Sequence, residues 1–362
     1  MSSIVIVGAG QTGRGFINRF VALAGERATF VDRDAALVEW LAQAGAYTVE
    51  FSSGTREPIR IDNFEALHVS DPAAAKAVSA ADIVFVSVGK GNLPDACGFL
   101  AGALSGAGRP VDVVTAENGV RVSAALDPLR EIPGVSVAES IVFCTTLAQD
   151  GTLDVLSEDQ SYLPYDRAAL GHDLALAGLE PEMRLDVLMQ RKIYTYNCVS
   201  ACVAYLGAYK GITVYADAAN DGEVALAVDR VLEKLNPCIA EAYDVPLAEQ
   251  VEFSRMAVRK FRDRGIVDTV DRNVRDPERK LARDERIMAP LLLMAERGVL
   301  SRELLLVAAA AVHYGERTSS LTRPVSTYFE ALPDEWQGIA MRYLGCMTDG
   351  EPLRFLLERM GA

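Results

Sequence analysis

Histidine and cysteine, the usual ligands of zinc, are scarce in this chain of 362 residues. It has three histidines and six cysteines, and no two cysteines form a CxxC pair. Zinc sites need three or four such ligands at close spacing. Cys198 and Cys202 fall on one face of a predicted helix, but two thiols without further ligands make a poor metal site. We therefore expect no metal, and reduced, buried cysteines instead of disulfides.

A surplus of basic residues and long apolar runs are also absent. The chain has 36 Lys and Arg against 50 Asp and Glu, a net charge of −14, which repels phosphate backbones and anionic lipids. The apolar run at 300–312 contains charges and is too short to span a membrane. The N-terminus, MSSIVIVGAG, lacks the pattern of a signal peptide. We expect a cytoplasmic protein without nucleic-acid or membrane partners, in which an anionic substrate would need a locally basic pocket.

Strand and helix signals alternate in the first half of the chain. Short β-branched apolar runs indicate buried parallel strands, and they occupy residues 3–8, 28–34, 82–88 and 111–116. Helical spacing lies between them, as at 13–24 and 34–44, which predicts a parallel sheet wrapped by helices. Residues 49–69 alternate in polarity and contain turn residues, so we expect a small antiparallel excursion there.

The second half has long amphipathic helical segments and almost no strand signal. The segments are 186–209, 223–243, 247–261 and 302–314. Proline and glycine punctuate residues 163–185, where we place the boundary. The prediction is an α/β N-terminal domain over 1–185 and an all-helical C-terminal domain over 186–362, a length that suits two domains.

The first strand and first helix are joined by Gly8-x-Gly10-x-x-Gly13. Gly8 permits a tight turn, Gly10 lets the backbone approach a pyrophosphate, and Gly13 lets the helix pack close to the strand. The pyrophosphate would meet the positive end of the helix, and Arg14 would add a charged contact. This context predicts a Rossmann domain that binds a dinucleotide; the alternative is a simple turn.

Asp32 ends the second strand, 19 residues after Gly13. A carboxylate there accepts hydrogen bonds from the adenosine ribose and repels a 2′-phosphate, which favours NAD over NADP. The neighbouring Arg33 complicates this prediction, because an arginine can accommodate the 2′-phosphate. The alternative role of Asp32 is to cap the next helix.

Lys192 and Asn197 stand on a helix that is otherwise apolar and aromatic. Burial lowers the pKa of a lysine, and the neutral amine can accept a hydroxyl proton while hydride leaves the same carbon. Asn197 can donate a hydrogen bond to the reacting oxygen. The alternative is a lysine at a helix edge with its charge in water, and an asparagine that only packs.

Residues 191–207, RKIYTYNCVSACVAYLG, resemble the helix of the polyol-specific long-chain dehydrogenases, the mannitol dehydrogenase family, whose pattern is Lys-x4-Asn-x2-His. Further blocks resemble that family in the same order along the chain, and within it they are most similar to members that act on a polyol phosphate. These blocks are GAGQTGRGF at 8–16, TAENGVR at 115–121, RDPERKLARDERIMAPLL at 275–292 and AAAAVHYG at 308–315.

The resemblance implies a role for several residues. Lys192 matches the general base, Asn197 and Asn118 match paired amides that hold the reacting oxygen, and Arg279 and Lys280 match basic substrate contacts. For the last two the alternative is a solvated helix with ion pairs to its own acids, namely Asp276, Glu278, Asp284 and Glu285. Glu117 is either an orienting group beside Asn118 or an ordinary acid at a strand end.

The sequence departs from the family pattern at two places. Ser200 replaces the motif histidine; a serine can donate a hydrogen bond to the substrate but cannot store a proton near neutral pH. An Asp-Arg pair of the family corresponds here to Phe143-Cys144-Thr145. His313 could supply an imidazole from another helix, or it is structural.

The resemblance implies an NAD-dependent enzyme that reversibly oxidises a secondary alcohol of a polyol, a sugar phosphate or a sugar acid. Two alternatives stay open, a 2-oxo acid reductase of the ketopantoate type and an NAD(H)-binding regulator without turnover. The expected partner is a small carbohydrate substrate, and both a monomer and a homodimer remain possible.

Overall fold

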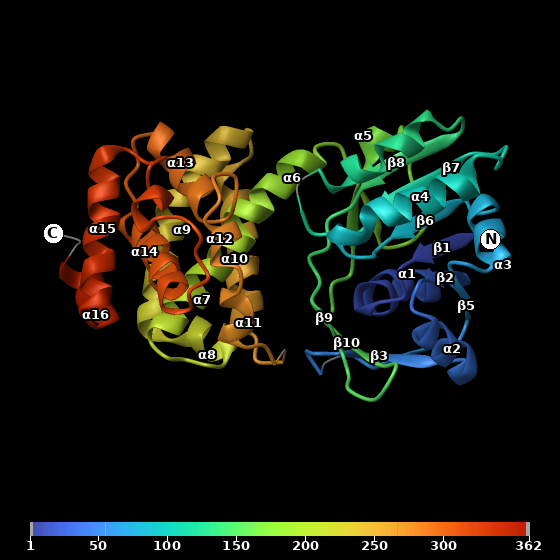
Figure 1. The fold of residues 1–362 in the computed structure, drawn as a ribbon, viewed down its shortest axis with the longest axis horizontal. Coiled ribbons are helices and arrows are strands. Elements are labelled where there is room, and N and C mark those ends of the chain that lie inside the picture. Colours follow the sequence, from blue (N-terminus) through green and yellow to red (C-terminus); the bar gives the residue numbers. More distant parts are fainter. Residues whose placement is uncertain (1–2, 55, 120, 266, 360–362) are drawn as a thin grey trace. The chain divides into compact units, whose positions relative to one another are not determined.

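The computed structural model describes residues 3–54, 56–119, 121–265 and 267–359. The chain divides into two compact units, Met1–Met189 and Gln190–Ala362, which run from blue to green and from green to red in Figure 1. The division falls inside helix α6 (Leu185–Lys192), four residues beyond the boundary expected from the sequence.

The N-terminal unit contains a six-stranded parallel sheet. Its strands are β1 (Ile4–Val7), β2 (Ala28–Asp32), β5 (Phe64–His68), β6 (Ile83–Val86), β7 (Val111–Thr115) and β8 (Val135–Glu139). Their order across the sheet is β5-β2-β1-β6-β7-β8, and each neighbouring pair is parallel. The order reverses beside β1, which is where α/β sheets of this kind bind their ligands.

Helices cover both faces of this sheet. Alternate residues of each strand point to opposite faces, and apolar residues on both faces pack against helices. In β1, Ile4 and Ile6 join the apolar cluster that contains Phe16, which lies in the π-helical turn Gly13–Ile17 before α1. Val5 and Val7 join the cluster on the other face. The helices of this unit are α1 (Asn18–Leu23), α2 (Ala35–Ala44), α3 (Pro72–Ser79), α4 (Leu93–Leu104) and the short α5 (Arg167–Leu170). This arrangement confirms the predicted α/β class.

Only part of the segment 49–69 forms the antiparallel strands that the sequence predicted for all of it. Strand β3 (Tyr47–Phe51) pairs antiparallel with β4 (Ile59–Ile61), but β5 joins the main sheet parallel to β2. The prediction was wrong for β5 because an edge strand can resemble a hairpin strand in the sequence: Phe64 and Ala66 pack on one apolar cluster, Glu65 is exposed, and Leu67 packs on the cluster of the opposite face.

Two smaller sheets complete this unit. Strand β3 also pairs with β10 (Val155–Ser157), which pairs with β9 (Thr146–Ala148). Strands β11 (Leu163–Asp166) and β12 (Leu179–Glu182) pair with each other. Strands β9 to β12 have three or four residues each, too few for a periodic signal in the sequence.

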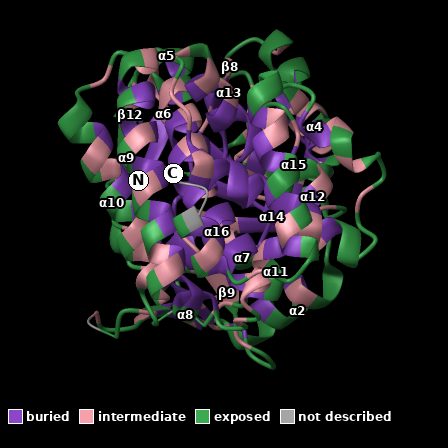
Figure 2. Cartoon of the chain, turned by 90° about the vertical axis from the view of Figure 1, so that its left-hand side faces the viewer, coloured by how far each residue is buried: buried purple, intermediate pink, exposed green. Residues whose placement is uncertain are grey.

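The C-terminal unit is helical, in agreement with the predicted class. Its helices are α7 (Cys198–Tyr209), α8 (Tyr215–Asn220), α9 (Gly222–Tyr243), α10 (Leu247–Arg262), α11 (Val270–Val274), α12 (Pro277–Lys280), α13 (Met288–Glu296), α14 (Arg302–Arg317), α15 (Asp334–Thr348) and α16 (Leu353–Arg359). Figure 2 shows α7 and α14 largely buried, with exposed segments on the outer helices.

The helix predicted over 186–209 is not a uniform α-helix. It consists of α6, a π-helical turn over Ile193–Asn197, and α7. In the described part of the chain, no helix is both long and apolar enough to cross a membrane.

Candidate active site

The glycine loop after β1 has the geometry that a bound dinucleotide requires. Gly8 has φ +104°, and a Cβ there would lie 2.0 Å from the carbonyl oxygen of Ser87. A Cβ on Gly13 would lie 2.1 Å from the carbonyl oxygen of Gly8. At Gly10, by contrast, a Cβ would meet no atom of the described residues within 4 Å. The loop is therefore closed on its inner side and open at the position where a pyrophosphate would approach.

A pocket of about 370 Å³ lies beside this loop, at the carboxyl ends of the strands. It is lined by Val7, Gly8, Gly10, Val31, Asp32, Arg33, Val69, Ser87, Val88, Asn92, Asp95, Ala96 and Phe99. Asp32 accepts hydrogen bonds from the backbone N–H groups of Ala9, at 2.6 Å, and of Asp34, at 2.9 Å. Its carboxylate thus links the glycine loop to the end of β2.

Arg33 is paired with an acid at the same pocket. Its Nη1 lies 3.6 Å from Oδ2 of Asp95, and both side chains are largely exposed. A 2′-phosphate on the adenosine ribose would therefore meet two carboxylates, Asp32 and Asp95, together with one arginine. This charge balance favours NAD over NADP.

Arg14 lies beneath the glycine loop. Its side chain is buried, Nη1 donates a hydrogen bond to the carbonyl oxygen of Ala9, and burial lowers its pKa. The structure thus gives this arginine a role in holding the loop. Its contact with the cofactor stays a prediction.

The loop after β7 carries Glu117 and Asn118. Oε1 of Glu117 accepts a hydrogen bond of 2.6 Å from the backbone N–H of Gly89, in the loop after β6. Burial raises the pKa of this carboxyl group, and its backbone hydrogen bonds oppose the rise. Glu117 therefore ties two loops at the carboxyl edge of the sheet together, while Asn118 is exposed.

In the helical unit, Lys192 is the last residue of α6 and is 7% exposed. Its pKa is lowered to about 7, first by burial and then by the positive charges of Lys260 and Arg286. Removing a charged amine from water disfavours its protonated form, and nearby cations add to that effect. A large fraction of this lysine is therefore neutral at neutral pH, as a general base must be.

The π-helical turn relates Lys192 to Asn197. The N–H of Cys198 donates to the carbonyl oxygen of Ile193, five residues earlier. In an α-helix, residues five positions apart point about 140° away from each other, because each residue turns the helix by about 100°. A turn closed over five residues places them on one side. The turn therefore brings Lys192 and Asn197 to the same face of the helix.

A cluster of positive charge adjoins Lys192. Lys280 is 6% exposed, and its pKa is lowered to about 8 by burial, Arg286 and Arg279. Its Nζ donates to the carbonyl oxygen of Asn273 and lies 5.8 Å from the ring centroid of Tyr205. The charge of Arg286 acts on both lysines, so Lys192, Lys280 and Arg286 form one basic region. This region contains a carboxylate of its own, because Nε of Arg286 pairs with Glu285 at 3.0 Å.

Arg279 and its neighbour Lys280 differ in their surroundings. Arg279 is half-exposed and bonds to Asp276, at 2.6 Å, and to Glu285, at 2.7 Å. That pairing matches the alternative of a solvated helix with ion pairs. Lys280 does not, because it is buried at the end of the four-residue helix α12.

Ser200 is half-buried and accepts a hydrogen bond of 3.0 Å from the hydroxyl of Tyr215. Burial raises the pKa of that tyrosine, so it remains a donor. His313 does not stand in for the missing histidine. Its ring packs 5.6 Å from the ring of Tyr209, which ends α7 about 18 Å along the helix from Asn197 at about 1.5 Å per residue.

Sequence reasoning missed three residues of this region. Arg286 lies in the block at 275–292, so its position there was a usable signal. Lys260 and Tyr215 lie on α10 and α8, far from Lys192 in the chain, and no local pattern could have pointed to them. Among the described residues there is no group of three or more His, Cys, Asp or Glu that could hold a metal ion.

A Rossmann unit with an open glycine loop, joined to a helical unit with a buried lysine, is the architecture of a dehydrogenase. Residues 2–131 match the family model of the mannitol dehydrogenase Rossmann domain, and residues 184–330 match that of the mannitol dehydrogenase C-terminal domain. The chain belongs to the mannitol dehydrogenase family, which confirms the resemblance seen in the sequence.

Individual relatives agree with this assignment. A mannitol-1-phosphate 5-dehydrogenase of Pseudarthrobacter chlorophenolicus is 30% identical over 334 residues, covering 85% of this chain and 84% of the relative. Another, of Enterococcus faecalis, is 25% identical over 335 residues, 87% of each chain. The fold is similar to that of Pseudomonas fluorescens mannitol 2-dehydrogenase, solved with NAD and D-mannitol, at a TM-score of 0.76 and 15% identity over 99% of this chain and 94% of that one.

Proposed function

We propose that this protein is an NAD-dependent dehydrogenase that reversibly oxidises a secondary alcohol of a polyol phosphate, with Lys192 as the general base. The observation that carries the proposal is the buried Lys192. Its pKa is lowered to about 7, and it directly precedes a π-helical turn, whose five-residue closure supports a common face for Lys192 and Asn197.

The residues of the N-terminal unit fit a nicotinamide dinucleotide. Gly8 and Gly13 close the turn, and Gly10 leaves the backbone open to the pyrophosphate. Asp32 would accept hydrogen bonds from the ribose hydroxyls, and together with Asp95 it disfavours a 2′-phosphate. NAD, when bound, supplies the hydride acceptor for alcohol oxidation.

The proton chemistry belongs to the helical unit. Neutral Lys192 takes the proton of the substrate hydroxyl as hydride leaves the same carbon, and the protonated lysine returns it in the reverse direction. Asn197 donates a hydrogen bond to the reacting oxygen. The family pattern also assigns a hydrogen bond to the reacting oxygen to Asn118. Ser200, supported by the hydroxyl of Tyr215, would hydrogen-bond a neighbouring hydroxyl of the polyol.

The basic region determines the substrate class that we propose. The charge of Arg286 acts on both Lys192 and Lys280. Glu285 pairs with Arg286 at 3.0 Å and balances one charge of this region, and an anionic group on the substrate would balance the charge that remains. Arg279 is left out of this anion site, because its guanidinium group is paired with Asp276 and Glu285. A polyol phosphate supplies both the anion and the secondary alcohol. Mannitol 1-phosphate is the first candidate, because the curated relatives are mannitol-1-phosphate 5-dehydrogenases.

The test is a substrate panel read by the absorbance of NADH. It holds mannitol 1-phosphate, mannitol, an aldonate and a 2-hydroxy acid, each with NAD+ and with NADP+. We expect turnover of mannitol 1-phosphate with NAD+, at a kcat/KM at least about 10-fold above that for mannitol, since a hydrogen-bonded charge pair contributes about 1.5–3 kcal/mol. Lys192→Ala is the control and should be inactive.

Other outcomes would replace the proposal. Turnover of the 2-hydroxy acid alone would indicate a 2-oxo acid reductase. Binding of NADH without turnover of any compound would indicate a regulator. Full activity of the Lys192→Ala variant would refute the assignment of the general base.

A further inference from the structure

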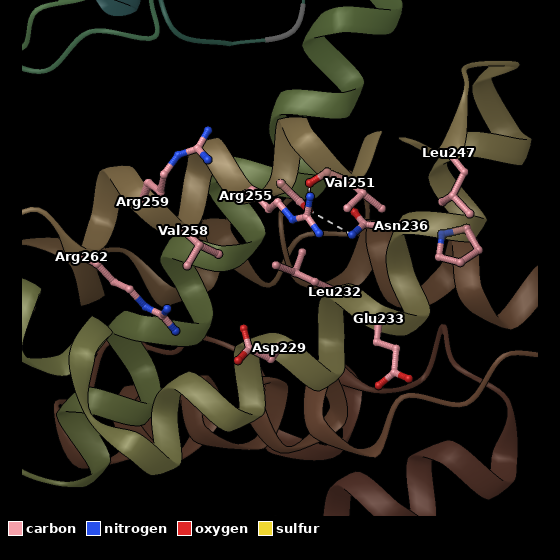
Figure 3. Close-up of a pocket in the computed structure, with 12 residues that line it drawn as sticks. Asp229, Leu232, Glu233, Asn236, Leu247, Val251, Arg255, Val258, Arg259 and Arg262 are labelled. Carbon is pink, nitrogen blue, oxygen red and sulfur yellow. Dashed lines mark hydrogen bonds between the residues drawn. The ribbon is translucent and has the colours of Figure 1, made fainter. Parts of the chain in front are cut away.

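A chain of buried polar side chains runs from a surface groove to the π-helical turn. The groove, of about 530 Å³, lies between α9 and α10 and is lined by Asp229 and Glu233 of α9 and by arginines of α10 (Figure 3). At its inner wall, Asn236 donates a hydrogen bond of 3.0 Å to Ser254, drawn as a dashed line in Figure 3. Asn236 and Ser254 are 5% and 2% exposed, so the chain leads inward from here.

Gln250 of α10 is the next member and is completely buried. Its Nε2 donates to Oδ1 of Asn236, at 3.3 Å, and to Oγ1 of Thr195, at 2.9 Å. Its Oε1 accepts from Nε of Arg191, at 3.0 Å. Because an arginine can only donate, the carbonyl oxygen of Gln250 must face Arg191 and the amide nitrogen must face Thr195.

The two partners of Gln250 on α6 and the π-helical turn lie on either side of Lys192 in the sequence. Arg191 directly precedes Lys192, and Thr195 is the central residue of the π-helical turn. Arg191 is further fixed by Glu249, at 2.7 Å, and by its guanidinium group over the ring of Phe253. A buried glutamine is costly unless its polar atoms are satisfied, and here each of its two polar atoms contacts the segment that sets the position of Lys192.

We propose that Gln250 and Thr195 are positioning residues: their hydrogen bond holds the π-helical turn that keeps Lys192 and Asn197 on one face of the helix. This inference rests on the proposed function, in which these two residues act on the same substrate oxygen. Single π-helical turns are rare and occur mostly at functional sites. A specific tertiary contact is therefore needed to hold one in place of the ordinary α-helical turn.

The aromatic contacts of the turn do not provide that specificity. Tyr196 packs at 5.1 Å against Phe253 and at 6.4 Å against Phe261, and such contacts tolerate a range of angles. The hydrogen bond from Gln250 to Thr195 is directional. If the turn reverted to an α-helix, the directions of Lys192 and Asn197 would diverge by about 140°.

The experiment compares three variants. Thr195→Val removes the hydroxyl at nearly constant volume, Thr195→Ser keeps it, and Gln250→Leu removes the amide. For oxidation of the best substrate of the panel, we expect Thr195→Val and Gln250→Leu to lower kcat by about 10- to 100-fold, the size of effect that a misplaced catalytic group produces. Thr195→Ser should stay near the wild-type rate. The double variant should be about as slow as either single variant, because both break the same link.

A matched control separates positioning from stability. Ser301→Ala removes the buried N-cap of α14, where the hydroxyl accepts from the N–H of Leu304, and does not touch the network. It should lower the melting temperature and leave both kcat and the midpoint of the pH–rate profile unchanged. Thr195→Val should lower kcat and shift that midpoint, whether or not its melting temperature changes.

A readout without turnover completes the test. The chain has seven lysines, so reductive methylation with ¹³C-formaldehyde and NMR can follow the titration of Lys192 directly. Its pKa should rise in Thr195→Val, because the amine leaves its buried position, and stay as in the wild type in Ser301→Ala.

The outcomes separate this inference from the proposed function. The positioning role of Thr195 and Gln250 would be overturned if Thr195→Val kept the wild-type kcat, the wild-type pH midpoint and the wild-type pKa of Lys192. This holds even if Lys192→Ala is inactive. A fully active Lys192→Ala would instead refute the proposed function. If Gln250→Leu does not fold, the pair Thr195→Val and Thr195→Ser decides the question alone.

Discussion

Replacing Lys192 by methionine should abolish activity and at the same time stabilise the helical unit. The pKa of this lysine is 10.5 in the unfolded chain and about 7 in the folded protein. At about 1.4 kcal/mol per pH unit, protonated Lys192 destabilises the fold by about 5 kcal/mol. A methionine of similar length removes this penalty and keeps an apolar stem in the same space.

The gain depends on pH in a defined direction. Between about pH 7 and pH 10.5 the unfolded chain binds a proton that folded Lys192 does not bind, so the wild type becomes more stable as pH rises. Below pH 7 the penalty is complete, and above pH 10.5 it is absent. Between pH 6 and pH 9.5 the advantage of Lys192→Met over the wild type should therefore shrink by about 3 kcal/mol.

Urea denaturation followed by the fluorescence of one tryptophan measures this difference. Of the two tryptophans, Trp336 is buried in α15 of the helical unit and Trp40 lies on α2 of the other unit. A Trp40→Phe background therefore makes the signal specific for the helical unit. Lys192→Arg is the control, because an arginine stays charged over this pH range. The difference in free energy of unfolding between Lys192→Arg and Lys192→Met should therefore not change with pH.

Parallel stability curves for the wild type and Lys192→Met from pH 6 to pH 9.5 would refute this reasoning. They would mean that Lys192 keeps the same pKa in the folded and unfolded states, and that burial does not make it a base near neutral pH.

Three further predictions concern the cofactor and the anion. Gly13→Ala should abolish NADH binding, measured by fluorescence titration, because its Cβ would lie 2.1 Å from the carbonyl oxygen of Gly8; tight binding by this variant would contradict the loop geometry. Asp32→Ser should raise the Kd of NADH on the order of 10- to 100-fold, the loss expected for hydrogen bonds to a charged group of about 1.5–3 kcal/mol. The same variant should also reduce the ratio of NADH affinity to NADPH affinity. An unchanged ratio would exclude a contact between Asp32 and the adenosine ribose. Arg286→Gln should raise KM for the polyol phosphate by about 10-fold or more while leaving that of neutral mannitol unchanged. Since the charge of Arg286 lowers the pKa of Lys192, it should also move the pH midpoint of oxidation upward, and equal effects on both substrates would argue against an anion contact.

Much of the N-terminal unit could be predicted because local signals and tertiary structure agree there. Ile4–Val7 of the predicted run is buried on both faces as β1, and Gly8 and Gly13 lie where the chain meets its own backbone. The edge strand β5 could not be placed, since its alternation fits a hairpin equally well. Partners of such strands are chosen by long-range packing, which a window of residues does not contain.

The helical unit shows a similar division. The pattern from Lys192 to Asn197 marked the candidate base, and the burial that lowers its pKa followed from its apolar neighbours in the sequence. The π-helical turn was not predictable, because a helical periodicity read over 186–209 does not reveal one extra residue in a single turn. Gln250 was also missed: its contact with Thr195 joins helices that are 55 residues apart in the chain.

The most direct test of the central claim is the pH dependence of kcat/KM for polyol oxidation, because this ratio reports the pKa of the base in the free enzyme. We predict a rise of about 10-fold per pH unit below pH 7 and a plateau above it, since only neutral Lys192 accepts the proton. Lys192→Ala should lose this dependence and recover part of its activity when a small primary amine is added. A flat profile in the wild type, or a Lys192→Ala variant with the same profile as the wild type, would contradict the role of Lys192 as the base.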